Sequence, residues 1–207
     1  MSPRSAGGSA VSAESGGESA LVLGPAIPAS ETTDCLDLFD VSGAASVLHV
    51  DYVRSPEWRL RQWSSADRPQ LERLGILRVG WRGNAVRPVE RLGSTLDVDV
   101  DVRTVEEPGN LTGVGLRLIQ LLERLADGPG STVVCVHSLS VMLQFVSLAR
   151  LAKFIPACNE QFERFGARGH FHLDPDAHDD ETVERLRGCF TPTDETALRR
   201  STVSLEA

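Results

Sequence analysis

Histidine and aspartate side chains gather in one short stretch near the C-terminal end of the chain, 170-HFHLDPDAHDD-180. His170 and His172 are two residues apart, so in a strand they share one face, and Asp174 and His178 follow downstream. Imidazole nitrogens and carboxylate oxygens are ligands that zinc and iron take in proteins. The spacing indicates a candidate metal site. The alternative interpretation is structural: the end of a strand followed by an acidic helix start.

A metal hydrolase built on these residues is one functional hypothesis. The H-x-H-x-D pattern resembles the start of the metal site in metallo-β-lactamase-type hydrolases, in which a histidine follows the aspartate directly; here that position holds Pro175. The remaining ligands of that family lie far downstream, and no histidine follows His178 in this chain. Such a site would have to borrow His49 or His137 from neighbouring strands.

A second candidate site begins at Gly24, in the stretch 21-LVLGPAIPASETTDCLDLF-39. A short apolar run, a turn with two prolines and a Thr/Asp-rich helix start form the strand–loop–helix context in which G-x-x-x-x-G-K-[ST] binds nucleotide phosphates. The positions reserved for the second glycine, the lysine and the hydroxyl residue hold Ala29, Ser30 and Glu31, or Glu31 and Thr32 for the last two after a one-residue shift. The residues alone predict only a strand, a turn and a helix.

An alternation of aspartate and valine begins like a calcium-binding loop. Asp97, Asp99 and Asp101 have the spacing of its first ligands. The sixth position, which requires glycine, holds Val102, and the twelfth, which requires glutamate, holds Pro108. The period of two instead predicts a strand with one wet, acidic face.

Two further patterns lack what their chemistry requires. Gly113 and Gly115 begin a helix as in a dinucleotide-binding fingerprint, but the third glycine is missing, so close helix packing is the better interpretation. Ser138 and Ser140 lie near His137 in the sequence, but such neighbours in an extended chain do not make a catalytic dyad. The chain also has no G-x-S-x-G nucleophile elbow.

The charge composition points to a salt-adapted protein. The 207 residues carry a formal net charge of -8, and Lys153 is the only lysine among 21 basic residues. A strongly acidic surface keeps a protein soluble where salt screens repulsion, which is the condition of a halophilic cytoplasm. A G+C-rich genome that replaces Lys by Arg is the alternative explanation. The acidic balance argues against a general nucleic-acid binder, which needs a basic footprint.

The cysteines and the apolar segments indicate the compartment. Four cysteines are widely spaced, without a C-x-x-C pair, and their apolar flanks predict buried thiols in a reducing environment. The N-terminus lacks the apolar region of a signal peptide, and no apolar run approaches the roughly 20 residues of a membrane span. We therefore expect a cytoplasmic protein that does not bind membranes.

Strand-like and helix-like segments alternate between a Ser/Gly/Ala-rich tail, residues 1–18, expected to be disordered, and a loose C-terminal tail, residues 191–207. Predicted strands span residues 20–24, 45–53, 74–81, 95–105, 131–139 and 168–174. Predicted helices start at 32–39 and span 55–63, 108–128, 141–166 with a bend or break near Pro156, and 175–190. This alternation predicts an α/β domain over residues 19–190 with a mostly parallel sheet, whose centre is the most apolar strand, 131–139.

The order of these segments resembles the RecA/KaiC-type branch of the P-loop ATPases, in particular an uncharacterised haloarchaeal family of that branch that lacks an intact nucleotide motif. The matching segments are LVLGPAIPAS, SVLHVDYVRSPEWRLRQW, EEPGNLTGVGLRLIQLLERL, TVVCVHSLSVMLQFVSLARLAKF and GHFHLDPDAHDDETVERL, which together cover about residues 19–190. The resemblance implies a three-layer RecA-like sandwich with a mostly parallel central sheet.

Within that resemblance, the nucleotide site is degenerate. An active relative places a loop lysine on the β- and γ-phosphates and a Ser/Thr hydroxyl on Mg²⁺, whereas these places here hold Ser30 and Glu31. The strand that should end in a Mg²⁺-supporting carboxylate has His137 at that position. The resemblance therefore implies a pseudo-ATPase without ATP hydrolysis and without a bound cofactor.

The leading functional hypothesis is a non-enzymatic regulatory or scaffolding protein. RecA-like domains assemble through their faces, so the resemblance implies a protein partner, either an active RecA-like relative or a second copy. The second hypothesis is a residual ATP-binding protein or weak ATPase that takes Mg·ATP and uses Arg54, Arg78 or Arg82 in place of the missing lysine. The metal hydrolase around His170 is the third.

Overall fold

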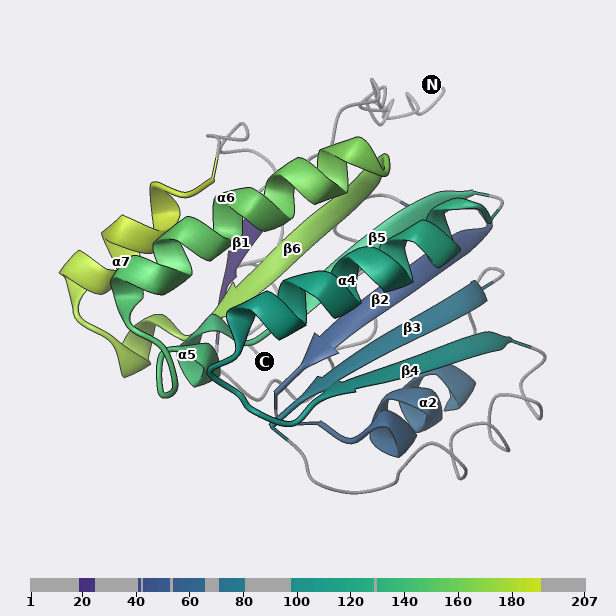
Figure 1. Ribbon diagram of the computed structural model, residues 1–207, viewed down its shortest axis with the longest axis horizontal. Helices are drawn as coiled ribbons and strands as arrows, with labels where there is room; N and C mark the ends of the chain where they lie inside the picture. Colours follow the sequence, from purple (N-terminus) through teal and green to yellow (C-terminus); the bar gives the residue numbers. More distant parts are fainter. Residues whose placement is uncertain are drawn as a thin grey trace, which may run out of the picture.

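A single parallel sheet organises the chain. The computed structural model describes residues 19–24, 41, 43–52, 54–65, 71–80, 98–128 and 130–190. Within them six strands pair in the order β1-β6-β5-β2-β3-β4, and every pairing is parallel (Figure 1). The strands are β1 Ser19–Leu23, β2 Ala45–Asp51, β3 Leu71–Val79, β4 Asp99–Val105, β5 Ser131–His137 and β6 Ala167–Leu173. The predicted α/β class with a parallel sheet is confirmed.

Helices connect these strands. They are α2 Pro56–Ser65, α4 Leu111–Ala126, α5 Leu139–Met142, α6 Leu148–Arg164 and α7 Asp180–Arg187, with a 3₁₀ turn at Pro175–Ala177. The predicted helix start at 32–39 and both predicted tails lie outside the described residues. None of the helices in the described ranges combines the length and the apolar character that a membrane crossing needs.

Helices flank the sheet on both faces. Leu48 and Val50 of β2 belong to the larger apolar cluster, which includes the inward-facing side chains of α4 and α6. The alternate residue Val47 packs with Leu60 and Trp63 of α2 in a second cluster. Since successive strand residues point to opposite faces, α2 lies on the face opposite to α4 and α6. Figure 1 shows α4 and α6 lying across the near face of the sheet.

Strand β5 lies in the interior of the sheet, between β6 and β2, as its apolar sequence predicts. Its residues from Val133 to Val136 are at most 2% exposed on both faces. A strand that is covered on both faces has a continuous apolar sequence, as this segment does.

The break in the predicted helix 141–166 does not lie at Pro156. Helix α5 ends at Met142, a turn follows, and α6 begins after Ser147, which takes the N-cap position with an extended backbone. Pro156 lies inside α6, which continues through it. The sequence predicts a bend or break near Pro156 because proline has the strongest helix-breaking tendency, and the structure has no break there.

The two glycines at the start of α4 have different roles. The Asn110 side chain accepts a hydrogen bond from the Gly113 N–H at 2.9 Å, and a Cβ on Gly113 would approach the Asn110 carboxamide nitrogen to 2.8 Å. Gly113 therefore leaves room for the helix cap. Gly115 does face α6, but a Cβ there would make an ordinary 3.6 Å contact with Phe154. The predicted close packing is thus not a strict requirement for glycine.

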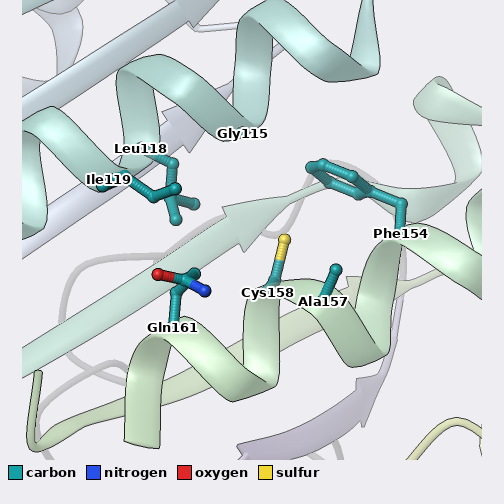
Figure 2. A pocket seen from close by; sticks show the side chains of 7 residues that line it. All are labelled: Gly115, Leu118, Ile119, Phe154, Ala157, Cys158 and Gln161. Atoms are coloured by element: carbon teal, nitrogen blue, oxygen red, sulfur yellow. The ribbon is translucent and has the colours of Figure 1, made fainter. Parts of the chain in front are cut away.

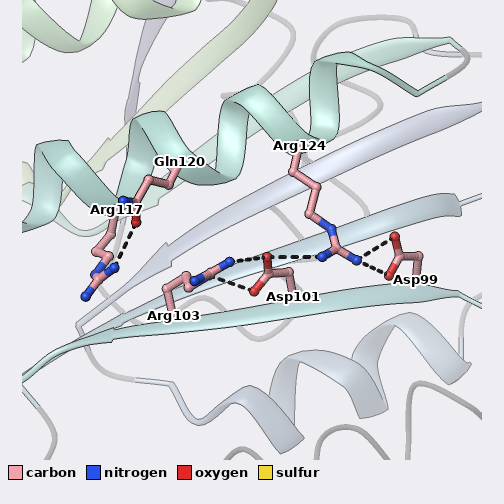
Figure 3. A network of polar contacts seen from close by, with 6 residues as sticks. All are labelled: Asp99, Asp101, Arg103, Arg117, Gln120 and Arg124. Atoms are coloured by element: carbon pink, nitrogen blue, oxygen red, sulfur yellow. Dashed lines mark hydrogen bonds and ion pairs between the residues drawn. The ribbon is translucent and has the colours of Figure 1, made fainter.

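The acidic face of β4 is not only exposed to solvent, because its aspartates form ion pairs with an arginine of α4. Arg124 of α4 pairs with Asp99 at 2.6 Å and approaches Asp101 to 3.6 Å, and Arg103 pairs with Asp101 at 2.9 Å (Figure 3). The Asp101 side chain is only 11% exposed. These ion pairs tether the edge strand to the helix beside it, while Asp97 lies outside the described residues.

Candidate functional site

The direction of the chain reverses in the middle of the sheet. From β2 the chain continues to β3 and β4 on one side, and from β5 it continues to β6 on the other. The carboxyl ends of all the strands share one edge because every pairing is parallel. In open parallel sheets, ligands bind outside the carboxyl ends of the two diverging strands. The candidate site therefore lies at Asp51 and His137, which end β2 and β5 and are register partners.

Asp51 forms a buried ion pair with Arg59. The Arg59 Nε and Nη2 groups donate to the two carboxylate oxygens at 2.8 and 2.7 Å, and neither side chain is exposed. The start of α2 positions the guanidinium: Pro56 occupies the first helical position, and the Ser55 hydroxyl accepts a hydrogen bond from the Trp58 N–H at 3.1 Å. Both carboxylate oxygens are therefore engaged in a bidentate contact inside the protein.

Two of the arginines predicted to replace the loop lysine lie at this edge, while Arg82 lies outside the described residues. Arg78 is the register partner of Asp51 on β3 and is 5% exposed. Burial lowers the pKa of Arg78, and the neighbouring carboxylates oppose that shift. The Arg54 guanidinium lies over the Trp58 ring, 4.3 Å from its centroid. Positive charge is thus present at the edge, next to the carboxylate of Asp51.

His137, at the predicted carboxylate position, is buried among other side chains of the site. It is 1% exposed, and its ring centroid lies 4.8 Å from that of His172. The Ser138 hydroxyl accepts a hydrogen bond from the first turn of α5 at 3.3 Å. The Ser140 hydroxyl accepts one from the Asp174 N–H at 2.9 Å. Both hydroxyls therefore hold backbone segments in place.

The predicted phosphate loop is described only at its first residue. The Gly24 N–H donates to the Leu173 carbonyl at 3.0 Å, which extends the pairing of β1 with β6 by one residue. The other predicted positions, Ala29, Ser30, Glu31 and Thr32, lie outside the described residues.

The predicted metal ligands divide into two groups. His170 and His172 lie with Cys135, and one potential ligand atom from each of the three falls within 4.8 Å of the others. Asp174 and His178 do not belong to this cluster, which is the one found in the described part of the chain. The Asp174 carboxylate instead accepts a hydrogen bond from the backbone N–H two residues on, at 3.1 Å.

Cys135 is the ligand that the sequence did not suggest. Strand β5 carries Cys135 and His137 two residues apart, and the paired strand β6 carries His170 and His172 with the same spacing. Residues two apart in a strand share a face, and the contact between the rings of His137 and His172 places both pairs on the same face of the sheet. The cysteine and the histidines come together only because β5 pairs with β6 in a register that sets Cys135 opposite His170. His49 on β2 is the register partner of Cys135, but its Nε2 atom accepts a hydrogen bond from Trp63 Nε1 at 3.0 Å.

A separate hollow lies between α4 and α6, with an accessible volume of about 140 Å³ (Figure 2). Its lining residues are Gly115, Leu118, Ile119, Phe154, Ala157, Cys158 and Gln161. No charged side chain lines it, and burial raises the pKa of the Cys158 thiol. These groups offer apolar contact but no acid–base or nucleophilic chemistry at neutral pH.

Comparison with known proteins gives one result. A family described as "Family of unknown function (DUF7504)" matches residues 17–193, which include every described strand and helix. No curated protein matches the chain.

Proposed function

Because the chain belongs to the family of unknown function DUF7504, we propose its function from the site: a non-enzymatic, RecA/KaiC-like protein with a degenerate nucleotide site. Its role is regulatory or scaffolding in the cytoplasm of a halophilic archaeon. Its partner is an active RecA-like relative or a second copy of the chain. The proposal includes a three-layer RecA-like sandwich, with which the parallel sheet and its flanking helices are compatible.

The observation that carries this proposal is the ion pair at the point where the chain reverses. Mg²⁺ is usually bound through one or two carboxylates together with substrate phosphates and waters, in near-octahedral geometry. At this edge the ends of β2 and β5 offer the Asp51 carboxylate and the His137 imidazole. A Mg²⁺ ion at Asp51 would compete for the carboxylate with Arg59, which is itself fully buried. A buried guanidinium deprived of its carboxylate is strongly unfavourable, so the pair opposes metal binding there.

The loop sequence supports the same conclusion. In the motif register, Ser30 takes the place of the lysine that contacts the β- and γ-phosphates, and Glu31 takes the place of the hydroxyl residue. A glutamate directed at a triphosphate would repel it, whereas lysine would stabilise the charge that develops during hydrolysis. The proposed defect therefore has two independent parts, one in the loop and one at the strand ends.

Calorimetry with Mg·ATP, together with an assay of phosphate release, tests the nucleotide part of the proposal. The protein is measured in roughly 2–3 M KCl, a salt level suited to its acidic surface. We expect neither saturable heat nor phosphate release. Intrinsic hydrolysis would contradict the proposal.

A residual ATP-binding protein is the second candidate, and Arg78 at the strand edge is the observation that favours it. This candidate predicts saturable binding that is lost in Arg78→Ala and kept in Arg185→Ala, a change at an exposed position on α7. Binding that neither variant alters would argue against Arg78 as the substitute cation.

The regulatory part of the proposal requires a partner. Light scattering at the same salt concentration measures the mass of the purified protein against the 22.4 kDa of one chain. A stable larger mass supports self-assembly, and co-purification with an active RecA-like ATPase supports the other arrangement. A strictly monomeric chain that changes neither the assembly nor the activity of such a relative would contradict a scaffolding role.

A further inference from the structure

A thiol and two imidazoles meet on one face of the sheet. Cys135 on β5 is the register partner of His170 on β6, and His172 follows two residues later on the same face. One potential ligand atom from each residue lies within 4.8 Å of the other two. Three atoms at that limit share a centre about 2.8 Å from each, whereas Zn–N and Zn–S bonds are about 2.0–2.3 Å. Shifts of roughly 0.5 Å for the sulfur and roughly 0.7–0.8 Å for the nitrogens would bring the three atoms to these bond lengths.

The cluster is buried. Cys135 and His170 are each 1% exposed, and His172 is 9% exposed. Paired β-strands fix the backbone positions of all three residues, so the donor atoms are held by the sheet rather than by loops. A buried set of this kind suits a closed, structural type of metal site.

His137 lies beside the cluster, outside the set of ligand atoms that fall within 4.8 Å of one another. It follows Cys135 by two residues, and its ring centroid is 4.8 Å from that of His172. Cys135, His137, His170 and His172 therefore form a compact group on two adjacent strands. His49, the register partner of Cys135 on β2, lies outside the cluster.

We propose that Cys135, His170 and His172 bind one thiophilic transition-metal ion, Zn²⁺ or Cu⁺, with His137 as the fourth ligand. One thiolate with imidazoles suits both ions, whereas Mg²⁺ and Ca²⁺ require oxygen ligands. The ion cross-links β5 to β6 and stabilises the middle of the sheet. This site differs from the hydrolase pattern of the sequence, because Asp174 and His178 take no part in it. It is also independent of whether the chain binds a nucleotide.

Metal titration of the chelator-treated full chain tests the proposal. Zn²⁺ is added in competition with a chromophoric chelator, Cu⁺ is added under reducing conditions, and Co²⁺ reports thiolate ligation through its charge-transfer absorption. We expect one equivalent of Zn²⁺ or Cu⁺ to bind and to raise the melting temperature. The Cys135→Ser and His170→Ala variants should bind more than about 100-fold more weakly, a larger loss than an outer-shell partner causes.

Matched controls separate the site from general effects on the fold. Cys158→Ser removes another buried thiol, and His178→Ala removes a histidine outside the cluster; both should bind metal like the wild type. If a cluster variant fails to fold, X-ray absorption of the wild-type complex still tests the proposal, because it must report one sulfur and three imidazole nitrogens. Absence of stoichiometric binding by either ion, or binding unchanged in Cys135→Ser, would overturn the proposal.

Discussion

At the scale of single residues, the buried pair of Asp51 and Arg59 is the most consequential polar contact in the described part of the chain. Both side chains are fully buried at the point where β2 and β5 diverge. Desolvation makes such a pair a weak source of net stability, but removal of one partner leaves an uncompensated charge. The pair therefore acts mainly as a constraint that holds α2 against the end of β2.

The first prediction concerns this ion pair. Arg59→Met should lower the free energy of unfolding by about 3–5 kcal/mol, because Asp51 would remain buried without its guanidinium. Adding Asp51→Leu to that variant should recover much of the loss. Urea unfolding measures both effects. The control is Arg187→Met, which breaks an exposed pair with Glu184 and should cost less than about 1 kcal/mol. Equal costs for the two single variants would contradict this account.

The second prediction concerns the cap of α7. Hydrogen bonds with Thr182, first to its side chain and then to its backbone N–H, hold the pKa of Asp179 below its usual value. Because the folded-state pKa is depressed, the ionised cap stabilises the helix above the unfolded pKa of about 3.9. That contribution is lost as the pH falls through the folded-state pKa.

Amide exchange of α7 measures this loss. Protection of the helix, corrected for the intrinsic pH dependence of exchange, should decrease below roughly pH 4 in the wild type. Asp179→Asn keeps a capping side chain but does not titrate, so its protection should change much less over the same range. Identical pH profiles for the two proteins would show that the carboxylate of Asp179 is not responsible.

At the scale of elements, β6 and α6 pack so closely that one position excludes a side chain. A Cβ on Gly169 would lie 2.3 Å from the ring of Phe162, which is itself fully buried. The Phe162 ring also packs on Phe171, at a centroid distance of 5.9 Å, so it cannot move without disturbing a second ring. The absence of a Cβ in β6 thus sets how closely the helix approaches the sheet.

The third prediction follows from this contact. Gly169→Ala should lower the free energy of unfolding by about 1–3 kcal/mol, because the added methyl group overpacks the core. Gly43→Ala is the control, since a Cβ there meets no atom of the described residues within 4 Å, and its effect should stay within about 0.5 kcal/mol. Denaturant unfolding measures both variants. Combining Gly169→Ala with Phe162→Leu should cost less than the sum of the single changes, and strict additivity would contradict the proposed clash.

The elements themselves could be predicted from local patterns, since all six strands lie within or close to the predicted ranges. Buried parallel strands appear as apolar runs, and α4 has a continuous apolar stripe. The interruption between α5 and α6 was misplaced to Pro156 because local tendency suggested a break there, whereas the chain turns after Met142. Tertiary packing determines whether a helix tolerates a proline, and no local pattern reports it.

The candidate site was harder to predict because it depends on which strands are neighbours. The sequence indicated His170 and His172 but not Cys135, which lies 35 residues earlier and meets them only through the pairing of β5 with β6. Asp51 likewise carries no motif, and its importance follows from the reversal between β2 and β5. Non-local contacts of this kind are fixed by the sheet order, which the alternation of elements leaves open.

At the scale of the whole molecule, the charge balance should determine how the protein responds to salt. The chain has 29 acidic and 21 basic residues, for a formal net charge of -8. Its described exposed ion pairs, such as Asp99 with Arg124, are weakened by salt, whereas the net repulsion among the excess carboxylates is relieved by it. Since individual exposed pairs contribute little, relief of repulsion should be the larger effect.

The fourth prediction is therefore that the melting temperature rises with the KCl concentration, from about 0.1 M to about 1 M and beyond. Over this range the Debye length falls from about 10 Å to about 3 Å. Thermal unfolding followed by circular dichroism measures the slope.

A variant with Glu106→Gln, Glu163→Gln and Glu181→Gln, all at exposed positions, changes the net charge from -8 to -5 and should melt higher at low salt with a shallower slope. Equal slopes in the two proteins would mean that excess negative charge does not set the response. A melting temperature independent of KCl in the wild type would favour a G+C-rich genome as the reason for the arginine-rich, lysine-poor composition.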